Sequence, residues 1–238
     1  MKAEVIIRLV HLEADAEDSG QHMRRDGIRR RARERVLLLA AEDLDVARER
    51  LELLFDCRDC ERGNDGSHGQ PQLQLDGAPS PVRLSYSRHG GWLLVALIFR
   101  PVLLGVDLED ADSDAFGETD NIDAIALTEE ERRLVRSSDS ARLMRARLWT
   151  RKEALLKSTG HGLRLAPDLV GVADTDGSPK LMLWPGHAGE RPGIRLLDLD
   201  LPASEAGIPV PASLAASLAV GGSSQPGIIF REELAARG

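Results

Sequence analysis

Apolar runs separated by polar, Gly-rich and Pro-rich stretches divide the first third of the chain into alternating strand and helix candidates. The run EVIIRLV predicts a first strand, and the Arg-rich stretch from about Asp26 into VLLLAAEDL predicts a helix. A second helix is expected from Asp45 through Phe55. The stretch from Glu61 to Pro81 is rich in turn residues and predicts a loop, with a short strand at PQLQL.

Two apolar segments in the middle of the chain, Trp92–Phe99 and Val102–Glu109, predict strands. Only Arg100 and Pro101 separate them, so we expect a tight hairpin. Both segments are apolar on both faces, as in strands of a sheet that is covered on each side. A polar loop is predicted to follow, from Asp110 to about Ala126.

The ends of the next helices are marked by specific residues. Thr128 and Glu131 have the spacing of a capping box, which opens a helix. The following helix is expected to begin near Ser138 to Ser140 and to run to Ser158, with Gly160 as its stop. Short strands are then predicted at DLVGVAD, KLMLWP and GIRLLDLDL, and a poorly ordered tail from Gly221.

Composition narrows the class of protein. At 238 residues, with 42% hydrophobic and 29% charged residues, the chain is long enough for one large or two small soluble domains. Its net charge of −8 argues against general nucleic-acid binding. The start, MKAEVIIRLV, lacks the pattern of a signal peptide, and the longest apolar run, WLLVALIF, is far too short to cross a membrane. We therefore expect a cytoplasmic protein without a membrane partner.

Two local clusters have both an ordinary and a functional interpretation. Seven arginines between residues 24 and 35 meet only Asp26 and Glu34, which indicates either a solvated helix face or a site for a small polyanion. Cys57 and Cys60 form one CxxC without a second pair, and with His68 a zinc site would still lack a fourth ligand. Two reduced thiols are the simpler interpretation.

The segment LWTRKEALLKSTGHGL carries the most informative chemistry. The chain has four lysines against 27 arginines, yet Lys152 and Lys157 both lie here, flanking Glu153. On a helix these three residues lie on the same side as Trp149. This pattern indicates either a surface helix with a Glu153–Lys157 pair or a site where an ammonium contacts a phosphate or gives up a proton.

A second group of charged residues ends the apolar segment GVDLED. Asp107 and Glu109 point to the same face of a strand, two residues apart, which fits either a plain strand end or a cation site. Together with Glu153 they would give a hard cation three oxygen ligands, and water and phosphate would complete the octahedron that Mg²⁺ prefers. Upstream, SYSRHGGW places Arg88 and His89 beside small residues that let a ligand approach.

Together, in this order and spacing, SRHGGW, GVDLE and WTRKEALLK resemble the motifs of the Sfp-type 4'-phosphopantetheinyl transferases. The later GHGL, and LDLDLP before LAASLAV, resemble the C-terminal half of that family. The resemblance covers about Ser85 to Val220. It implies an α/β (α+β) fold with two similar subdomains in one chain, a pseudo-dimer with the active site in the cleft between them. We accordingly divide the chain into residues 1–101, residues 102–222 and a tail, 223–238.

The resemblance also implies the reaction. Members transfer the 4'-phosphopantetheine arm of coenzyme A to a serine of an apo carrier protein and release 3',5'-ADP, with Mg²⁺ as cofactor. A carrier protein of polyketide, nonribosomal peptide or fatty-acid synthesis would be the partner. A monomer is expected because the cleft is formed within one chain.

Matching the motifs residue by residue gives a set of expected roles. Asp107, Glu109 and Glu153 would hold Mg²⁺ against the pyrophosphate. Lys157 would contact the phosphate and stabilise or protonate the departing 3',5'-ADP. The base that accepts the serine proton would be Glu153 or a water on the metal. The residues expected to bind or support the coenzyme are Arg35, Ser87, Arg88, His89, Lys152 and Lys157.

Some positions depart from the family pattern. Arg88 stands where many members have a histidine that contacts the 3'-phosphate of the nucleotide, and an arginine can bind a phosphate through two hydrogen bonds. In the sequence GQP, Gln70 replaces a lysine that is common in the family. We expect the first arginine-rich helix to supply the missing charge, through Arg35.

Two other functions stay open at this point. One is a Mg²⁺-dependent nucleotide pyrophosphate hydrolase that uses the same acidic cluster. The other is a catalytically reduced member that only binds coenzyme A or a carrier domain. The arginines at positions 142, 145 and 147, beside Leu143 and Met144, either help to dock an acidic carrier or form an exposed helix face.

Overall fold

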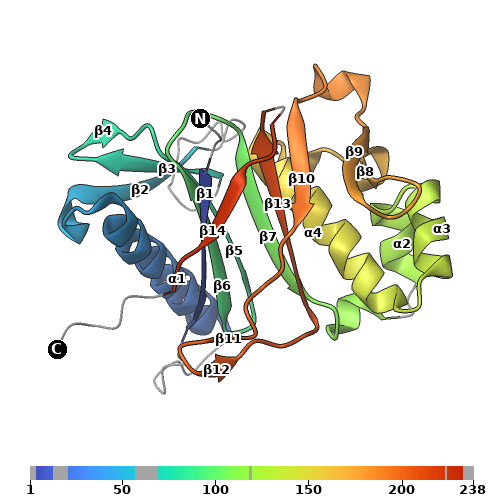
Figure 1. The fold of residues 1–238 in the computed structure, drawn as a ribbon, viewed down its shortest axis with the longest axis horizontal. Helices are drawn as coiled ribbons and strands as arrows, with labels where there is room; N and C mark the ends of the chain where they lie inside the picture. Colours follow the sequence, from blue (N-terminus) through green and yellow to red (C-terminus); the bar gives the residue numbers. More distant parts are fainter. Residues whose placement is uncertain (1–3, 13–20, 57–68, 118–119, 223, 233–238) are drawn as a thin grey trace.

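Two sheets stacked face to face, each covered on its outer side by one long helix, form the body of the computed structural model (Figure 1). The model describes residues 4–12, 21–56, 69–117, 120–222 and 224–232. The first sheet has the strand order β14-β1-β6-β5 and the second the order β10-β13-β7. Their strands are β1 (Glu4–His11), β5 (Arg83–His89), β6 (Trp92–Ile98), β14 (Gly227–Phe230), β7 (Leu104–Asp110), β10 (Ile194–Asp198) and β13 (Leu214–Gly221).

Helix α1 (Gln21–Leu44) covers the outer face of the first sheet, where the arginine-rich segment predicted a helix. Successive side chains of a strand point to opposite faces, so Leu93, Val95 and Leu97 of β6 pack against Val36 and Leu39 of α1. The intervening residues of β6 face the second sheet. The middle strand is therefore apolar on both faces because a helix lies on one side of it and a sheet on the other.

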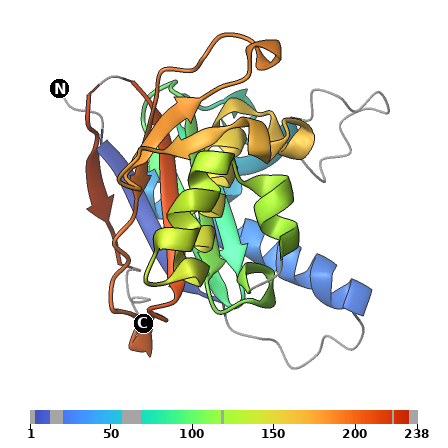
Figure 2. The ribbon, with the colours of Figure 1, turned by 90° about the vertical axis from the view of Figure 1, so that its right-hand side faces the viewer.

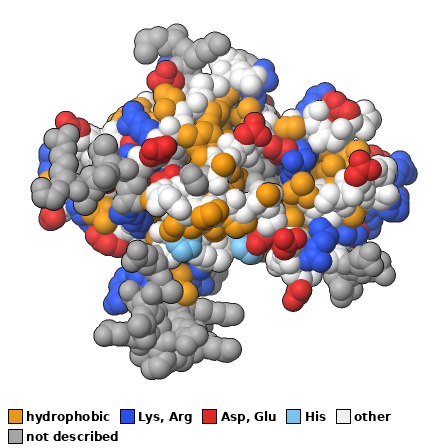
Figure 3. All heavy atoms as spheres, turned by 60° about the horizontal axis from the view of Figure 1, so that its bottom comes forward, with side chains coloured by type: hydrophobic (Ala, Val, Ile, Leu, Met, Phe, Trp, Pro, Cys, Tyr) orange, Lys and Arg blue, Asp and Glu red, His pale blue; other side chains and the backbone are white. Residues whose placement is uncertain are grey.

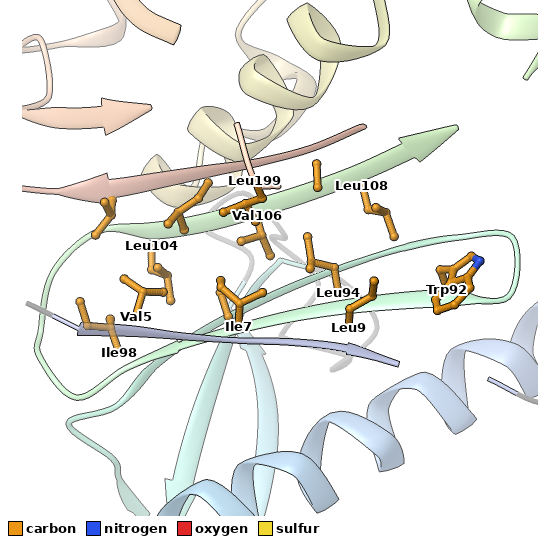
Figure 4. Close-up of a cluster of buried hydrophobic side chains, with 14 residues drawn as sticks. Val5, Ile7, Leu9, Trp92, Leu94, Ile98, Leu104, Val106, Leu108 and Leu199 are labelled. Atoms are coloured by element: carbon orange, nitrogen blue, oxygen red, sulfur yellow. The ribbon is translucent and has the colours of Figure 1, made fainter. Parts of the chain in front are cut away.

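The core between the two sheets is built from the inward-facing residues of β1, β6, β7 and β13 (Figure 4). Figure 4 shows side chains of β1 and β6 pointing toward those of β7. The buried members of this cluster that the figure labels are Val5, Ile7, Leu9, Trp92, Leu94, Ile98, Leu104, Val106, Leu108 and Leu199. This shared core joins the two halves of the chain.

The predicted hairpin between the two central strands is wrong. Strands β6 and β7 lie in different sheets, β6 between β1 and β5 and β7 beside β13. After Ile98 the chain turns from one layer to the other instead of pairing with itself. The sequence pattern was correct about burial on both faces, but burial alone does not decide which strands share hydrogen bonds.

The predicted helix from Asp45 through Phe55 is also wrong. This stretch forms a 3-10 turn, Arg48–Arg50, and strand β2 (Leu51–Asp56). Strand β2 pairs with β3 (Gln70–Leu75), which includes the predicted short strand, and β3 pairs with β4 (Ala78–Pro79). Leu51 and Leu73 are both buried in the core under α1, so pairing and burial with a distant strand override the local helix pattern.

The second half of the chain follows the prediction more closely. Helix α3 (Glu129–Ser137) opens with the predicted capping box, and helix α4 (Ala141–Thr159) ends at Gly160, whose φ of 73° is left-handed. The predicted short strands are present as β8 (Gly171–Ala173), β9 (Pro179–Leu183) and β10. In Figure 2, α3 and the short helix α2 (Asp120–Ala126) lie in front of α4. Helix α2 and a 3-10 turn, Asp114–Phe116, lie where a plain polar loop was expected.

The C-terminal segment does not form a disordered tail throughout, so that expectation is wrong for residues 227–230. These residues form β14, which runs parallel to β1 at the edge of the first sheet. Arg231 follows it and bonds Asp43 of α1, which also holds the buried Arg8 of β1. A strand from the far end of the sequence thus completes the sheet of the first half.

The α+β fold with two sheet-and-helix halves is as expected, while the boundaries proposed for the subdomains stay a prediction. No helix in the described ranges is both long and apolar enough to cross a membrane. The remaining described elements are β11 (Ser204–Glu205), β12 (Ile208–Pro209) and the 3-10 turns Gly162–Arg164, Pro167–Leu169 and Gly186–Ala188. Cys57, Cys60 and His68 lie outside the described residues.

Candidate active site

Strands β5 and β7 come from different halves of the chain, and their side chains bond to each other. The Ser87 hydroxyl donates to Asp107 Oδ1 over 2.7 Å. Two residues further along both strands, His89 Nδ1 lies 2.6 Å from Glu109 Oε2. Because side chains alternate along a strand, the spacing of two in each sequence places these pairs on one side of the β5–β7 junction.

Helix α4 completes the group from the outer side of the second sheet. It packs closely on β7 because residue 105 is glycine: a Cβ there would lie only 2.0 Å from the backbone oxygen of Ala154. This close approach brings Lys157 Nζ to 2.6 Å from Asp107 Oδ1 and 3.0 Å from Ser87 Oγ. The site therefore joins both halves of the chain through Ser87, Asp107 and Lys157.

Two buried carboxylate oxygens of the group, Asp107 Oδ2 and Glu153 Oε1, have no hydrogen-bond partner among the described residues. The Asp107 side chain is only 4% exposed, so water does not readily solvate it. A buried acceptor without a partner costs about 1–3 kcal/mol, so folded proteins rarely keep one without a reason. A cation or a donor from a ligand would satisfy both oxygens.

The carboxylates are close enough to perturb one another. Burial, followed by the negative charges of Asp107 and Glu109, raises the pKa of Glu153 to about 7, although Lys157 opposes the shift. Burial and the charge of Asp107 also raise the pKa of Glu109, against the opposing effect of His89. The group thus gathers three carboxyl groups around the ammonium of Lys157, an excess of acidic groups that is typical of a site for a cation.

As the side chains stand, however, no three His, Cys, Asp or Glu groups in the described ranges are gathered closely enough to ligate one ion. Lys157 holds Asp107 and His89 holds Glu109 in this arrangement. The chemistry of the donor set fits a hard divalent cation, because all three groups are carboxylates and two of their oxygens are free. Ligation by all three would require their side chains to turn toward a common point.

The His89–Glu109 pair lies toward the surface, where these side chains keep 28% and 25% of their area exposed. Both β5 and β7 end toward the lower face of the molecule in Figure 1. Figure 3 shows this face, where histidine and acidic side chains lie beside a band of hydrophobic ones. The outer part of the group is therefore open to a ligand, whereas Asp107 lies deeper.

A basic group lies on the other face of β5. Burial and the nearby charge of Arg29 lower the pKa of Arg88. Burial raises the pKa of Tyr86, while the charges of Arg33, Lys157 and Arg29 oppose that shift. These mutual effects place two arginines of α1 near β5, and the guanidinium carbon of Arg33 also lies 4.2 Å from the ring centre of Phe55.

The arginines of α1 that face β5 differ from the one expected. Arg29 and Arg33 are four residues apart and share one face of the helix, as i and i+4 positions do. Arg35 lies two residues further, about 200° around the helix from Arg33, so it points elsewhere. The i, i+4 spacing in the sequence carries this signal, and the role assigned to Arg35 stays a prediction.

The expected role of Lys152 in binding the coenzyme is contradicted by its surroundings. Its side chain is fully buried, and its ammonium lies 2.7 Å from Glu131 Oε2 in the capping box of α3. It also donates to the backbone oxygens of Pro167 and Val170. Burial lowers the pKa of Lys152, although Glu131 opposes that shift. Lys152 therefore holds α4 to α3 and to the chain before β8.

Other predicted residues also bond within the chain. Arg142 donates to the backbone oxygens of Ala111, Asp112 and Ser113, and Arg145 forms a two-pronged ion pair with Asp123 of α2. Gln70 donates to the backbone oxygens of Lys157 and Ser158. Docking of a carrier by Arg142 or Arg145 loses its basis, since both guanidinium groups fasten segments next to the site. Arg147 alone of the three is exposed.

Comparison with known proteins supports the resemblance read from the motifs. Residues 103–195 match the family model described as the 4'-phosphopantetheinyl transferase superfamily, which confirms the resemblance at that level. The model does not separate the Sfp type from other members, so that subdivision stays a prediction. No curated protein matches the chain.

Two solved structures are similar over about half of the chain. One is the holo-[acyl-carrier-protein] synthase of Thermotoga maritima, with 18% identity, a TM-score of 0.38, and coverage of 50% of this chain and 63% of that one. The other is the holo-ACP-synthase of Plasmodium yoelii, with 17% identity, a TM-score of 0.38, and coverage of 52% and 97%. The match thus spans less than two thirds of the Thermotoga chain.

Proposed function

We propose that this chain, whose residues 103–195 match the 4'-phosphopantetheinyl transferase superfamily, transfers the 4'-phosphopantetheine arm of coenzyme A to a serine of an apo carrier protein. The other product is 3',5'-ADP. One observation carries the proposal: Lys157 and Asp107 meet Ser87 at the junction of the two halves, with two partnerless carboxylate oxygens beside them. This is the charge pattern needed to hold a pyrophosphate through a cation and an ammonium.

The residues that would hold Mg²⁺ are Asp107, Glu109 and Glu153. The cation would neutralise charge on the pyrophosphate of coenzyme A when bound. Without a cation, burial and then the negative charge of Asp107 raise the pKa values of Glu109 and Glu153. Ser87 keeps Asp107 Oδ1 bonded, so Oδ2 is the oxygen left for a ligand.

The transfer forms one phosphorus–oxygen bond and breaks another. The serine oxygen of the carrier attacks the phosphorus next to the pantetheine arm, and the bond from that phosphorus to the 3',5'-ADP oxygen breaks. Glu153 would accept the proton of the serine. Lys157 stabilises the negative charge that develops on the departing 3',5'-ADP.

The basic group on the other face of β5 would bind the 3'-phosphate of coenzyme A. The charge of Arg29 contributes to the lowered pKa of Arg88, and the charges of Arg33 and Arg29 oppose the rise in the pKa of Tyr86. Like charges held together in this way are stabilised by an anion, and a guanidinium binds a phosphate through two parallel hydrogen bonds. We also propose that the chain acts as a monomer in the cytoplasm.

Release of 3',5'-ADP, measured with and without an apo carrier protein, tests the proposal. The chain is incubated with coenzyme A and Mg²⁺, and nucleotide and carrier are quantified together. We expect release only with the carrier, one nucleotide for each modified serine. Release without a carrier would instead identify a pyrophosphate hydrolase. Binding of coenzyme A without any release, across several carriers, would identify a protein that only binds it.

A further inference from the structure

Gln70 ties the first half of the chain to the end of the helix that carries Lys157. It is the first residue of β3, and its side-chain Nε2 lies 3.2 Å from the backbone oxygen of Lys157 and 3.2 Å from that of Ser158. Both oxygens belong to the last turn of α4. An amide group has two N–H donors, so this one side chain uses both of them on the helix end.

The last turn of a helix needs such donors, because its final four carbonyl groups have no partner within the helix. In α4 the other donors are local. Gly160 N bonds the Lys157 oxygen, and the Thr159 hydroxyl bonds the oxygens of Leu155 and Leu156. Gln70 adds donors to the carbonyl groups of this turn from the other half of the chain.

This tie acts on the residue that the proposed reaction needs most. Lys157 reaches Asp107 and Ser87 through a flexible four-carbon side chain, so its ammonium is placed only as well as its backbone. The bonds from Gln70 to the oxygens of residues 157 and 158 add a second restraint on the end of α4, beside its close packing on β7 at Gly105.

We propose that Gln70 is a positioning residue for Lys157 and not a ligand of the coenzyme. This inference rests on the proposed transferase function. Its amide donors are turned toward α4, and its Oε1 lies close to Gly160, 3.5 Å from where a Cβ of that residue would be. In the resembling family a lysine is common at this position, whereas here a neutral side chain binds the helix end.

Steady-state kinetics of position-70 variants test the proposal. Gln70→Met keeps the length of the side chain but has no donor, and Gln70→Lys keeps a donor. Gln74→Met, on the same strand and face, is the matched control. We expect Gln70→Met to lower kcat about 10-fold, with KM for coenzyme A changed less than about 2-fold, since only the placement of Lys157 is affected. Gln70→Lys should recover most of kcat, and Gln74→Met should change neither constant.

The rate of amide hydrogen exchange in peptides over residues 156–161 tests the contact of Gln70 with the end of α4 without depending on enzymatic activity. Gln70→Met should speed exchange there, without a change in the middle of α4. A rise in KM for coenzyme A at constant kcat would overturn the proposal and make Gln70 a coenzyme ligand. Unchanged exchange would overturn it as well, even if the wild-type chain transferred nothing. Absence of transfer by wild type, with faster exchange in Gln70→Met, would instead reject the transferase and leave the tie intact.

Discussion

Lys157 Nζ lies 2.6 Å from Asp107 Oδ1, and both groups share the hydroxyl of Ser87. The three residues come from α4, β7 and β5, so the contact joins both sheets and both halves of the chain. Asp107 is 4% exposed at its side chain and Lys157 32%, which makes the aspartate the more deeply buried partner. Both the stability of this part of the fold and the proposed reaction therefore depend on the charges of Lys157 and Asp107.

Replacing Lys157 should therefore destabilise the fold through the charge that it leaves behind. We expect Lys157→Met to lower the free energy of unfolding by about 2 kcal/mol, because the buried Asp107 carboxylate loses its cation. Adding Asp107→Asn to this variant should recover at least half of that loss. Urea unfolding measures both. Lys180→Met, which removes an exposed pair with Asp174, is the control and should change stability by less than about 0.5 kcal/mol. No recovery in the double variant would contradict the assigned pair.

Replacing Arg88 of β5 should weaken the binding of coenzyme A more than the binding of its analogue without the 3'-phosphate. We expect Arg88→Ala to raise KM about 10-fold for coenzyme A and less than 2-fold for 3'-dephospho-coenzyme A, since a phosphate–guanidinium pair contributes on the order of 1.4 kcal/mol. Arg83→Ala, which removes an exposed arginine at the other end of β5 and on its opposite face, should affect neither substrate. Equal effects of Arg88→Ala on both substrates would place the 3'-phosphate elsewhere.

The raised pKa of Glu153 predicts how stability changes with pH in the metal-free chain. The pKa of this carboxyl is about 7 in the folded state, against an ordinary value near 4.5, so the folded state binds its proton more tightly. Between those two values the unfolded state has lost the proton and the folded state has not, so stability falls as pH rises through this window. Glu153→Gln should remove the effect: it should stabilise the chain by about 1–2 kcal/mol at pH 8 and have little effect at pH 4. Thermal unfolding at the two pH values checks this, and an equal shift at both would contradict it.

Lys152 should matter for stability and not for the affinity of the coenzyme. Lys152→Met leaves the buried Glu131 without a cation, and we expect a loss of about 3–5 kcal/mol. Adding Glu131→Gln should restore part of it. In the double variant, KM for coenzyme A should stay within about 2-fold of wild type, because the ammonium is enclosed by Glu131 and two carbonyl groups. A large rise in KM would contradict this expectation and support a role of Lys152 in binding coenzyme A.

Helices α3 and α4 could be predicted from the sequence, because their start and stop signals are local. The capping box at Thr128 and the stop at Gly160 depend on neighbours three or four residues away. The pairing of Asp107 and Glu109 on one side of a strand likewise follows from the alternation of side chains. Such local geometry follows from the spacing of residues along the chain.

Relationships across the fold could not be predicted in the same way. Lys152 and Lys157 lie on one helix, and the sequence assigned both to one charged face. Whether an ammonium meets Glu131 or Asp107 depends on where α3 and β7 pack, which is set by distant segments. Strand β14 was missed for the same reason, since four residues near the end of the chain gain their structure only by pairing with β1. The hairpin between β6 and β7 is absent because β6 pairs with β1 and β5, whereas β7 pairs with β13.

The most direct test of the account is intact-mass spectrometry of an apo carrier protein incubated with this chain, coenzyme A and Mg²⁺. Wild type is compared with Lys157→Met, and Lys180→Met serves as the control. We expect a gain of about 340 Da, the mass of the added arm, with wild type and with Lys180→Met, and none with Lys157→Met in the same time. An unmodified carrier with wild type across several carrier types, or full modification by Lys157→Met, would contradict it.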